Sequence, residues 1–120
     1  MERERRLRKN EEFQRVFRHG QSTANRQFVV YALPRPEGGT FRVGVSVSKK
    51  LGKAVVRNRL KRLIKEAVRA HADKIRPGVD VVLIARAPAL ELDYHQMVKS
   101  VGHVLRRAGL IVEKRSRLST

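Results

Sequence analysis

Cysteine and tryptophan are absent from this chain of 120 residues, and aromatic residues make up only 5% of it. Without cysteine the chain forms neither disulfides nor thiolate metal sites, which fits a reducing compartment. No apolar run approaches the roughly 20 residues that cross a bilayer. The charged opening segment MERERRLRK is not followed by the apolar stretch of a secretory signal. We therefore expect a cytoplasmic protein with no membrane partner.

Acidic residues are also scarce. Lys and Arg number 28 against 11 Asp and Glu, which gives a formal charge of +17 and a pI of about 11.6. Cations at this density repel one another, so the natural partner is a polyanion, with nucleic acid first. An anionic membrane surface is the second possibility. It is less favoured because membrane-surface helices usually carry Trp or Phe, and the most basic segment here has neither.

That segment, residues 49–65, reads KKLGKAVVRNRLKRLIK and holds eight Lys or Arg and no acid. Val56, Leu60 and Ile64 recur at helical spacing, which predicts a helix from about 54 to 72 with an apolar face on the core and cations outward. Two stripes of polar residues run along the predicted helix and converge. The candidate RNA-binding residues are Lys49, Lys50, Lys53, Arg57, Asn58, Arg59, Lys61, Arg62, Lys65 and Arg69.

The rest of the chain alternates helical and strand-like patterns. We expect helices near 10–19 and 93–108, a bent strand or two short strands in 22–33, and further strands at 40–48 and 79–85. In the last helix Asp93 is followed by Gln96 at capping-box spacing.

This pattern predicts an α+β fold in the order α-β-β-β-α-β-α, with a small mixed sheet packed by helices. The strand–helix–strand unit over 40–86 predicts a parallel pair joined by a crossover. We expect one RNA-binding domain over residues 1–120. Within it, residues 1–9 form a mobile basic arm without a core face, and residues 113–120 form a basic tail.

No catalytic or metal-binding pattern is found. The carboxylates Asp73, Asp80 and Asp93 are scattered, whereas hydrolysis by the protein would need a clustered set or an acid–base pair. His95 and His103 lie eight residues apart with no carboxylate at ligand spacing, so zinc is not expected. We predict that the protein itself holds no catalytic residue and no metal ion.

Aromatic residues leave two alternatives open. Phe13 and Phe17 share one face of the first predicted helix and fit a core position. Phe28 and Tyr31 lie three apart, so a regular strand places them on opposite faces, and one of them could be an exposed platform for single-stranded bases.

The basic segment resembles the RNR motif of the bacterial ribonuclease P protein subunit. The likeness rests on KKLGKAVVRNRLKRLIKEAVR together with NEEFQRVFRHGQSTANRQFVVYAL and FRVGVSVSKK, and it covers about residues 7–108. Lys65 departs from the pattern, because the family more often has Arg there. Lysine keeps the charge but loses the planar fork that binds a phosphate at two points.

This resemblance implies a subunit that binds a large catalytic RNA, which cleaves precursor tRNA to form the mature 5′ end. The RNA and its magnesium ions would perform the hydrolysis. The RNR helix and its loop would contact the RNA, and a cleft would hold the single-stranded 5′ leader, with Phe13, Phe17 and Tyr31 as its aromatic residues. The resemblance also implies a left-handed crossover, against the usual preference.

Two alternatives to this function remain at this stage. A generic RNA-binding or ribosomal-type protein would share the charge and size but need not distinguish precursor from mature tRNA. An enzyme in its own right would cleave its substrate without added RNA, and the missing cluster of acids argues against it.

Overall fold

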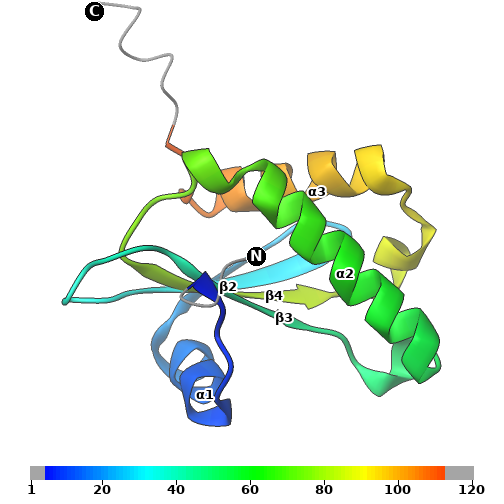
Figure 1. The fold of residues 1–120 in the computed structure, drawn as a ribbon, viewed down its shortest axis with the longest axis horizontal. Coiled ribbons are helices and arrows are strands. Elements are labelled where there is room, and N and C mark those ends of the chain that lie inside the picture. Colours follow the sequence, from blue (N-terminus) through cyan, green and yellow to red (C-terminus); the bar gives the residue numbers. More distant parts are fainter. Residues whose placement is uncertain (1–4, 113–120) are drawn as a thin grey trace, which may run out of the picture.

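The structure is a computed structural model that describes residues 5–112. Its helices and strands follow in the predicted order (Figure 1): α1 (Asn10–His19), β1 (Gln21–Ala24), β2 (Phe28–Pro34), β3 (Arg42–Ser46), α2 (Ala54–Ala70), β4 (Val79–Ala85) and α3 (Tyr94–Arg107). Short 3₁₀ helices occupy Lys49–Leu51 (η2), Ala72–Lys74 (η3) and Ala87–Glu91 (η4). Of the two possibilities for residues 22–33, the structure has two strands, separated at 25–27.

The four strands form one mixed sheet in the order β1-β2-β4-β3. β1 pairs with β2 and β2 with β4 in antiparallel fashion, whereas β3 and β4 are parallel. The apolar strand β4 therefore has a neighbour on each side, as expected for a central strand. The predicted α+β fold and the parallel β3-α2-β4 unit are confirmed. The handedness of the crossover stays an expectation from the family resemblance.

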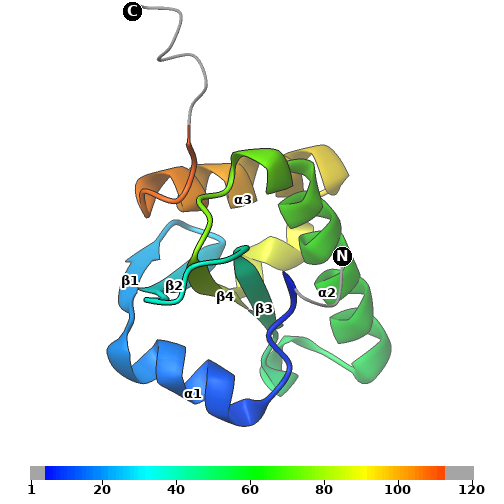
Figure 2. The same cartoon turned by 60° about the vertical axis from the view of Figure 1, so that its left-hand side comes forward.

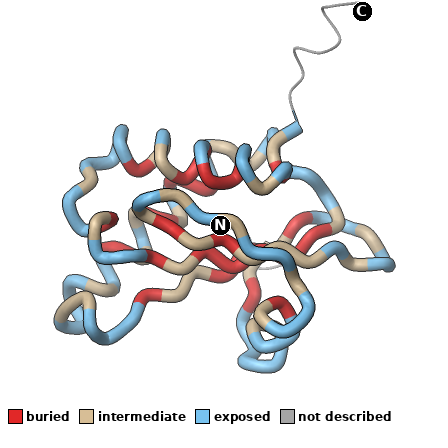
Figure 3. The backbone as a smooth tube through the Cα atoms, turned by 180° about the vertical axis from the view of Figure 1, so that it is seen from behind, coloured by how far each residue is buried: buried red, intermediate tan, exposed pale blue. Residues whose placement is uncertain are grey.

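Helices cover both faces of the sheet. Figure 2 places α2 and α3 on one face and α1 on the other. Alternation along β4 divides its side chains: Val81 and Leu83 join the large core under α2 and α3, and Val82 joins a smaller cluster under α1. In Figure 3 the buried backbone follows the sheet and the inward sides of the helices.

The amphipathic character of α2 explains its orientation. Leu60, Ile64, Ala67 and Val68 are buried against the sheet and α3, at the helical spacing seen in the sequence. The basic residues between these apolar positions lie on the outward face of the helix, away from the core. Helix α3 begins with the predicted capping box, in which the backbone N–H of Gln96 donates a hydrogen bond to Asp93 Oδ1 at 2.8 Å.

The N-terminal segment corrects one expectation. Residues 1–9 were expected to lack a core face, but Leu7 is buried beneath α1. Its amide donates to the Val43 carbonyl at 3.0 Å, so this part of the chain runs along the edge strand β3. A single apolar residue among charges has no period from which burial could be predicted. Residues 1–4 and 113–120 lie outside the described residues, so the expected arm and tail remain predictions there.

Candidate nucleic-acid interface

The outward face of α2 and the turn before it carry the predicted cations. Lys49 and Lys50 lie on η2, Lys53 is the residue before α2, and the others lie along the helix. Three of the ten are partly buried, namely Arg57, Lys61 and Lys65, and the other seven are exposed. None of the ten is buried, so a polyanion could approach this face.

The two predicted stripes do converge. Five of the ten residues border one shallow groove of about 290 Å³ on α2: Asn58, Lys61, Arg62, Lys65 and Arg69. Glu66 also borders this groove and pairs with Arg69 at 3.2 Å. The pair is well exposed, so water screens it and both side chains can rearrange at little cost. The groove thus presents a strip of cations along the side of the helix.

The turn into α2 depends on Gly52. Its φ of +144° lies where side-chain-bearing residues are rarely found, so the lone glycine of KKLGK has a structural reason. The Gly52 carbonyl accepts a hydrogen bond from Arg57 Nε at 3.0 Å. Arg57 therefore braces the turn through this nitrogen.

The three candidate leader-binding aromatics come together between α1 and the sheet. Phe13, Phe17 and Tyr31 pack around buried Val16 and Val82, and each is partly exposed. The Phe17 and Tyr31 rings meet edge to face, with centroids 5.2 Å apart. We call these three residues the aromatic cluster. Phe28 lies on the opposite face of the sheet and is fully buried, so Tyr31 is the partly exposed member of that pair.

The position of Phe13 depends on Gly44, which has no side chain and faces the Phe13 ring. A Cβ atom built on Gly44 of β3 would clash with the Phe13 ring, so only glycine leaves room for the ring in this position. Glycine at this position therefore lets α1 approach the sheet.

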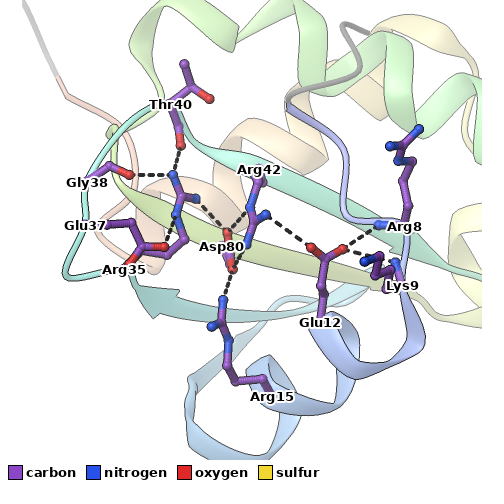
Figure 4. Close-up of polar contacts among 10 residues, drawn as sticks. All are labelled: Arg8, Lys9, Glu12, Arg15, Arg35, Glu37, Gly38, Thr40, Arg42 and Asp80. Carbon is purple, nitrogen blue, oxygen red and sulfur yellow. Dashed lines mark hydrogen bonds and ion pairs between the residues drawn. The ribbon is translucent and has the colours of Figure 1, made fainter.

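A buried ion cluster, which the sequence analysis did not predict, lies beside the aromatic cluster. Figure 4 shows Asp80 at its centre. The carboxylate is fully buried and accepts hydrogen bonds from Arg15 at 2.8 Å, Arg35 at 2.7 Å and Arg42 twice at 2.8 Å. Four bonds fill the acceptor sites of a carboxylate. We call Asp80 with these three arginines the Asp80 cluster.

The arginines also decide the protonation of Asp80. Burial by itself raises the pKa of a carboxyl group, but the hydrogen bonds from Arg42, Arg35 and Arg15 outweigh it and hold the pKa of Asp80 below its ordinary value. Asp80 is therefore a charged, fully satisfied group at neutral pH. It has no acceptor site left for a metal ion or a catalytic proton transfer.

Within residues 5–112, no three His, Asp or Glu side chains gather in an arrangement that could hold a metal ion. In the same part of the chain, every helix is too short or too polar to span a bilayer. Asp73 and Asp93 are both exposed, and neither joins Asp80 in a carboxylate pair.

Comparison with known proteins gives consistent matches. The sequence model of the ribonuclease P family matches residues 1–109. The chain is 57% identical over 109 residues to the ribonuclease P protein component of Geobacillus kaustophilus, a match that covers 91% of this chain and 90% of that one. It is 52% identical over 110 residues to the Bacillus cereus component, covering 92% and 96%.

Solved structures agree with the fold. A Staphylococcus aureus RNase P protein mutant with defective mRNA degradation activity has a TM-score of 0.85 and 45% identity, over 92% of this chain and 93% of that one. The Thermotoga maritima RNase P protein in complex with 1-(4-fluorophenyl)-2-thiourea has a TM-score of 0.76 and 32% identity, over 84% and 97%. These matches decide against an unrelated ribosomal-type protein. The chain belongs to the ribonuclease P protein family, whose members are the protein subunit of an RNA-based endoribonuclease that acts in tRNA processing.

Proposed function

We propose that the protein binds the catalytic RNA through the cationic face of α2 and the 5′ leader of precursor tRNA through the aromatic cluster. The observation that carries the proposal is that the two surfaces lie on opposite faces of one sheet. A protein built in this way can hold two nucleic-acid strands at once. Because bacterial precursor tRNA is made in the cytoplasm, we propose that location as well.

The face of α2 suits a folded RNA. Its groove is lined by four cations, Asn58 and a single acid, Glu66, and phosphate recognition needs charge more than base-specific contacts. Each phosphate that a cation neutralises releases condensed counterions, so binding is favoured entropically and weakens as salt rises. The residues proposed to make these contacts are Lys49, Lys50, Lys53, Arg57, Asn58, Arg59, Lys61, Arg62, Lys65 and Arg69.

The aromatic cluster suits a single strand. Single-stranded bases expose their π-faces, and aromatic side chains bind them by stacking with little sequence preference. Phe13, Phe17 and Tyr31 are partly exposed rather than sealed in a core, which stacking requires. A mature tRNA has no 5′ leader, so this surface would favour the precursor over the product.

We assign magnesium to the catalytic RNA. Bound there, it supplies the activated water and the charge stabilisation of phosphodiester hydrolysis. The residues of this chain would reduce phosphate repulsion and hold the leader in place. Part of the work of divalent ions would then pass to protein cations, so the protein should matter most when magnesium is low.

The test is cleavage of precursor tRNA at low magnesium by the catalytic RNA alone, by the protein alone and by both. We expect no cleavage by the protein, little by the RNA and efficient 5′ maturation by the mixture, followed on a denaturing gel. Clean cleavage by nuclease-free protein without RNA would contradict the assignment. An RNA that works equally well with and without the protein would contradict the supporting role.

Phe17→Ala tests the aromatic cluster. A stacked base is worth about 1–3 kcal/mol, so the holoenzyme should bind precursor tRNA at least several-fold more weakly and mature tRNA as before. Tyr94→Ala, which removes a 42% exposed aromatic ring on α3, is the matched control and should change neither affinity. Thermal melts by circular dichroism must accompany the binding assay. Equal losses for both tRNAs with a lowered melting temperature would mean that Phe17 is only a core residue.

A further inference from the structure

Few fully buried apolar side chains hold helix α1 on the sheet. Val16 is the one fully buried residue of this helix. Among residues 5–112 the cluster beneath it has two other buried members, Leu7 and Val82, and its remaining apolar members are only partly buried: Phe13, Phe17, Tyr31, Leu33 and Ile84. The core on the other face of the sheet is far larger and is shared by two helices. Apolar burial therefore fixes α2 and α3 more firmly than α1. The position of α1 above the sheet needs a further restraint.

The Asp80 cluster supplies that restraint (Figure 4). Arg15 comes from α1, Arg42 from β3, Arg35 from the start of the β2–β3 connection, and Asp80 from β4. Arg42 also forms an ion pair at 3.2 Å with Glu12 of α1. The Glu12 carboxylate in turn accepts hydrogen bonds from the backbone N–H groups of Arg8 and Lys9. Two side chains of α1 are thus tied to the sheet by ionic hydrogen bonds, which are strong and directional.

Charge counting argues against a direct RNA contact here. When Glu12 and Glu37, which pair with Arg42 and Arg35, are counted with the Asp80 cluster, three arginines meet three carboxylates. This group of six side chains is therefore neutral within a chain of net charge +17. The side chain of Arg35 is only 7% exposed and donates to the Gly38 and Thr40 carbonyls as well as to Asp80. These arginines are committed to the protein and add little net field for phosphates.

We propose that Asp80 is a positioning residue for the aromatic cluster. Through Arg15 it fixes where α1 lies above the sheet, and so it fixes the spacing of Phe17 on α1 from Tyr31 on β2. The inference rests on the proposed binding of the leader at the aromatic cluster. It assigns leader affinity to a buried carboxylate that touches no RNA.

The experiment uses Arg15→Ala, because Asp80 keeps Arg35 and Arg42 and the fold should survive. The holoenzyme reconstituted with the catalytic RNA is titrated with precursor tRNA and with mature tRNA over a series of salt concentrations. We expect precursor binding to weaken by about three- to tenfold, and mature tRNA binding to stay the same. Arg15→Lys, which can still donate one bond to Asp80, should restore most of the affinity.

Salt dependence separates positioning from phosphate contact. The Arg15 side chain is 47% exposed, so a direct contact is the competing explanation. Positioning leaves the log–log salt slope unchanged, whereas a lost phosphate contact reduces it by roughly 0.7. Arg18→Ala on the same helix removes an equal, exposed charge and measures the purely electrostatic loss. A reduced slope, or equal losses for Arg15→Ala and Arg18→Ala, would overturn the inference.

The Phe17→Ala background completes the test. If Arg15 acts through the aromatic cluster, adding Arg15→Ala to Phe17→Ala should cost little further affinity, because the site is already damaged. Additive losses would overturn the inference. They would leave the proposed function intact, because Phe17→Ala alone would still weaken binding of precursor tRNA and not of mature tRNA. A Phe17→Ala variant with full precursor affinity would overturn the proposed leader site and this inference together.

Discussion

Asp80→Asn is expected to lower the free energy of unfolding by about 3–5 kcal/mol, measured by urea denaturation. An amide has one acceptor oxygen and a pair of N–H donors, so it cannot satisfy three guanidinium groups. Arg35, nearly buried, would keep its charge without its main partner. Leaving a buried charge unpaired costs more than losing a surface pair, which is worth roughly 0–1 kcal/mol.

Asp73→Asn is the matched control, because Asp73 is an exposed carboxylate on η3. Its effect should stay within about 0.5 kcal/mol. Hydrogen exchange should localise the damage in Asp80→Asn, with the amides of α1 losing protection before those of α3. Uniform loss of protection across both helices would mean that the Asp80 cluster supports the whole fold and not α1 in particular.

Acid titration gives an independent check. The folded pKa of Asp80 lies below its ordinary value, so the stability from its pairing is fully present above the unfolded pKa of roughly 3.9 and is lost as the pH falls through the folded value. Glu12 acts in the same direction, because the backbone amides of Arg8 and Lys9 lower its pKa. The native protein should therefore lose stability below about pH 4 more steeply than Asp80→Asn does. Parallel acid curves for the two proteins would contradict this account.

Local sequence patterns predicted much of the fold. The alternation over 40–48 predicted a half-buried strand, the apolar spacing from Val56 to Ile64 predicted α2, and the pair Asp93 and Gln96 predicted the start of α3. In each case the signal and the structure involve residues close in sequence, where periodicity and capping act. The convergence of Asn58, Arg62 and Lys65 on one groove follows from the same helical geometry.

Such local patterns do not predict ion pairs between residues that are far apart in the sequence. Asp80 is separated from Arg15, Arg35 and Arg42 by 65, 45 and 38 residues, and nothing local marks them as partners. In a chain with 28 basic residues, an arginine on a strand is easily taken for an RNA ligand. The only sequence sign was that Asp80 interrupts the apolar run VDVVLIA, since a charge on a central strand needs a partner.

Replacing Lys61, Arg62 and Lys65 together by alanine should cause the largest loss of affinity for the catalytic RNA. All three line the groove on α2, whereas Arg57 is left in place because its Nε braces the turn at Gly52. Each lost phosphate contact lowers the log–log salt slope by roughly 0.7–0.9, so three lower it by roughly two to three. Over a fourfold rise in salt, the native protein should lose about 20–40-fold more affinity than the variant.

The matched control replaces Lys74, Lys99 and Arg107, three exposed cations outside α2, by alanine. It removes the same charge, so equal losses in the two triple variants would mean that net charge and not the face of α2 binds the RNA. Folding should not suffer in the α2 variant. Like charges three and four residues apart repel by roughly 0.2–0.5 kcal/mol per pair, as Lys65 does with Arg62 and Lys61. The melting temperature should therefore hold or rise while RNA binding falls, and this opposition separates a binding surface from a structural one.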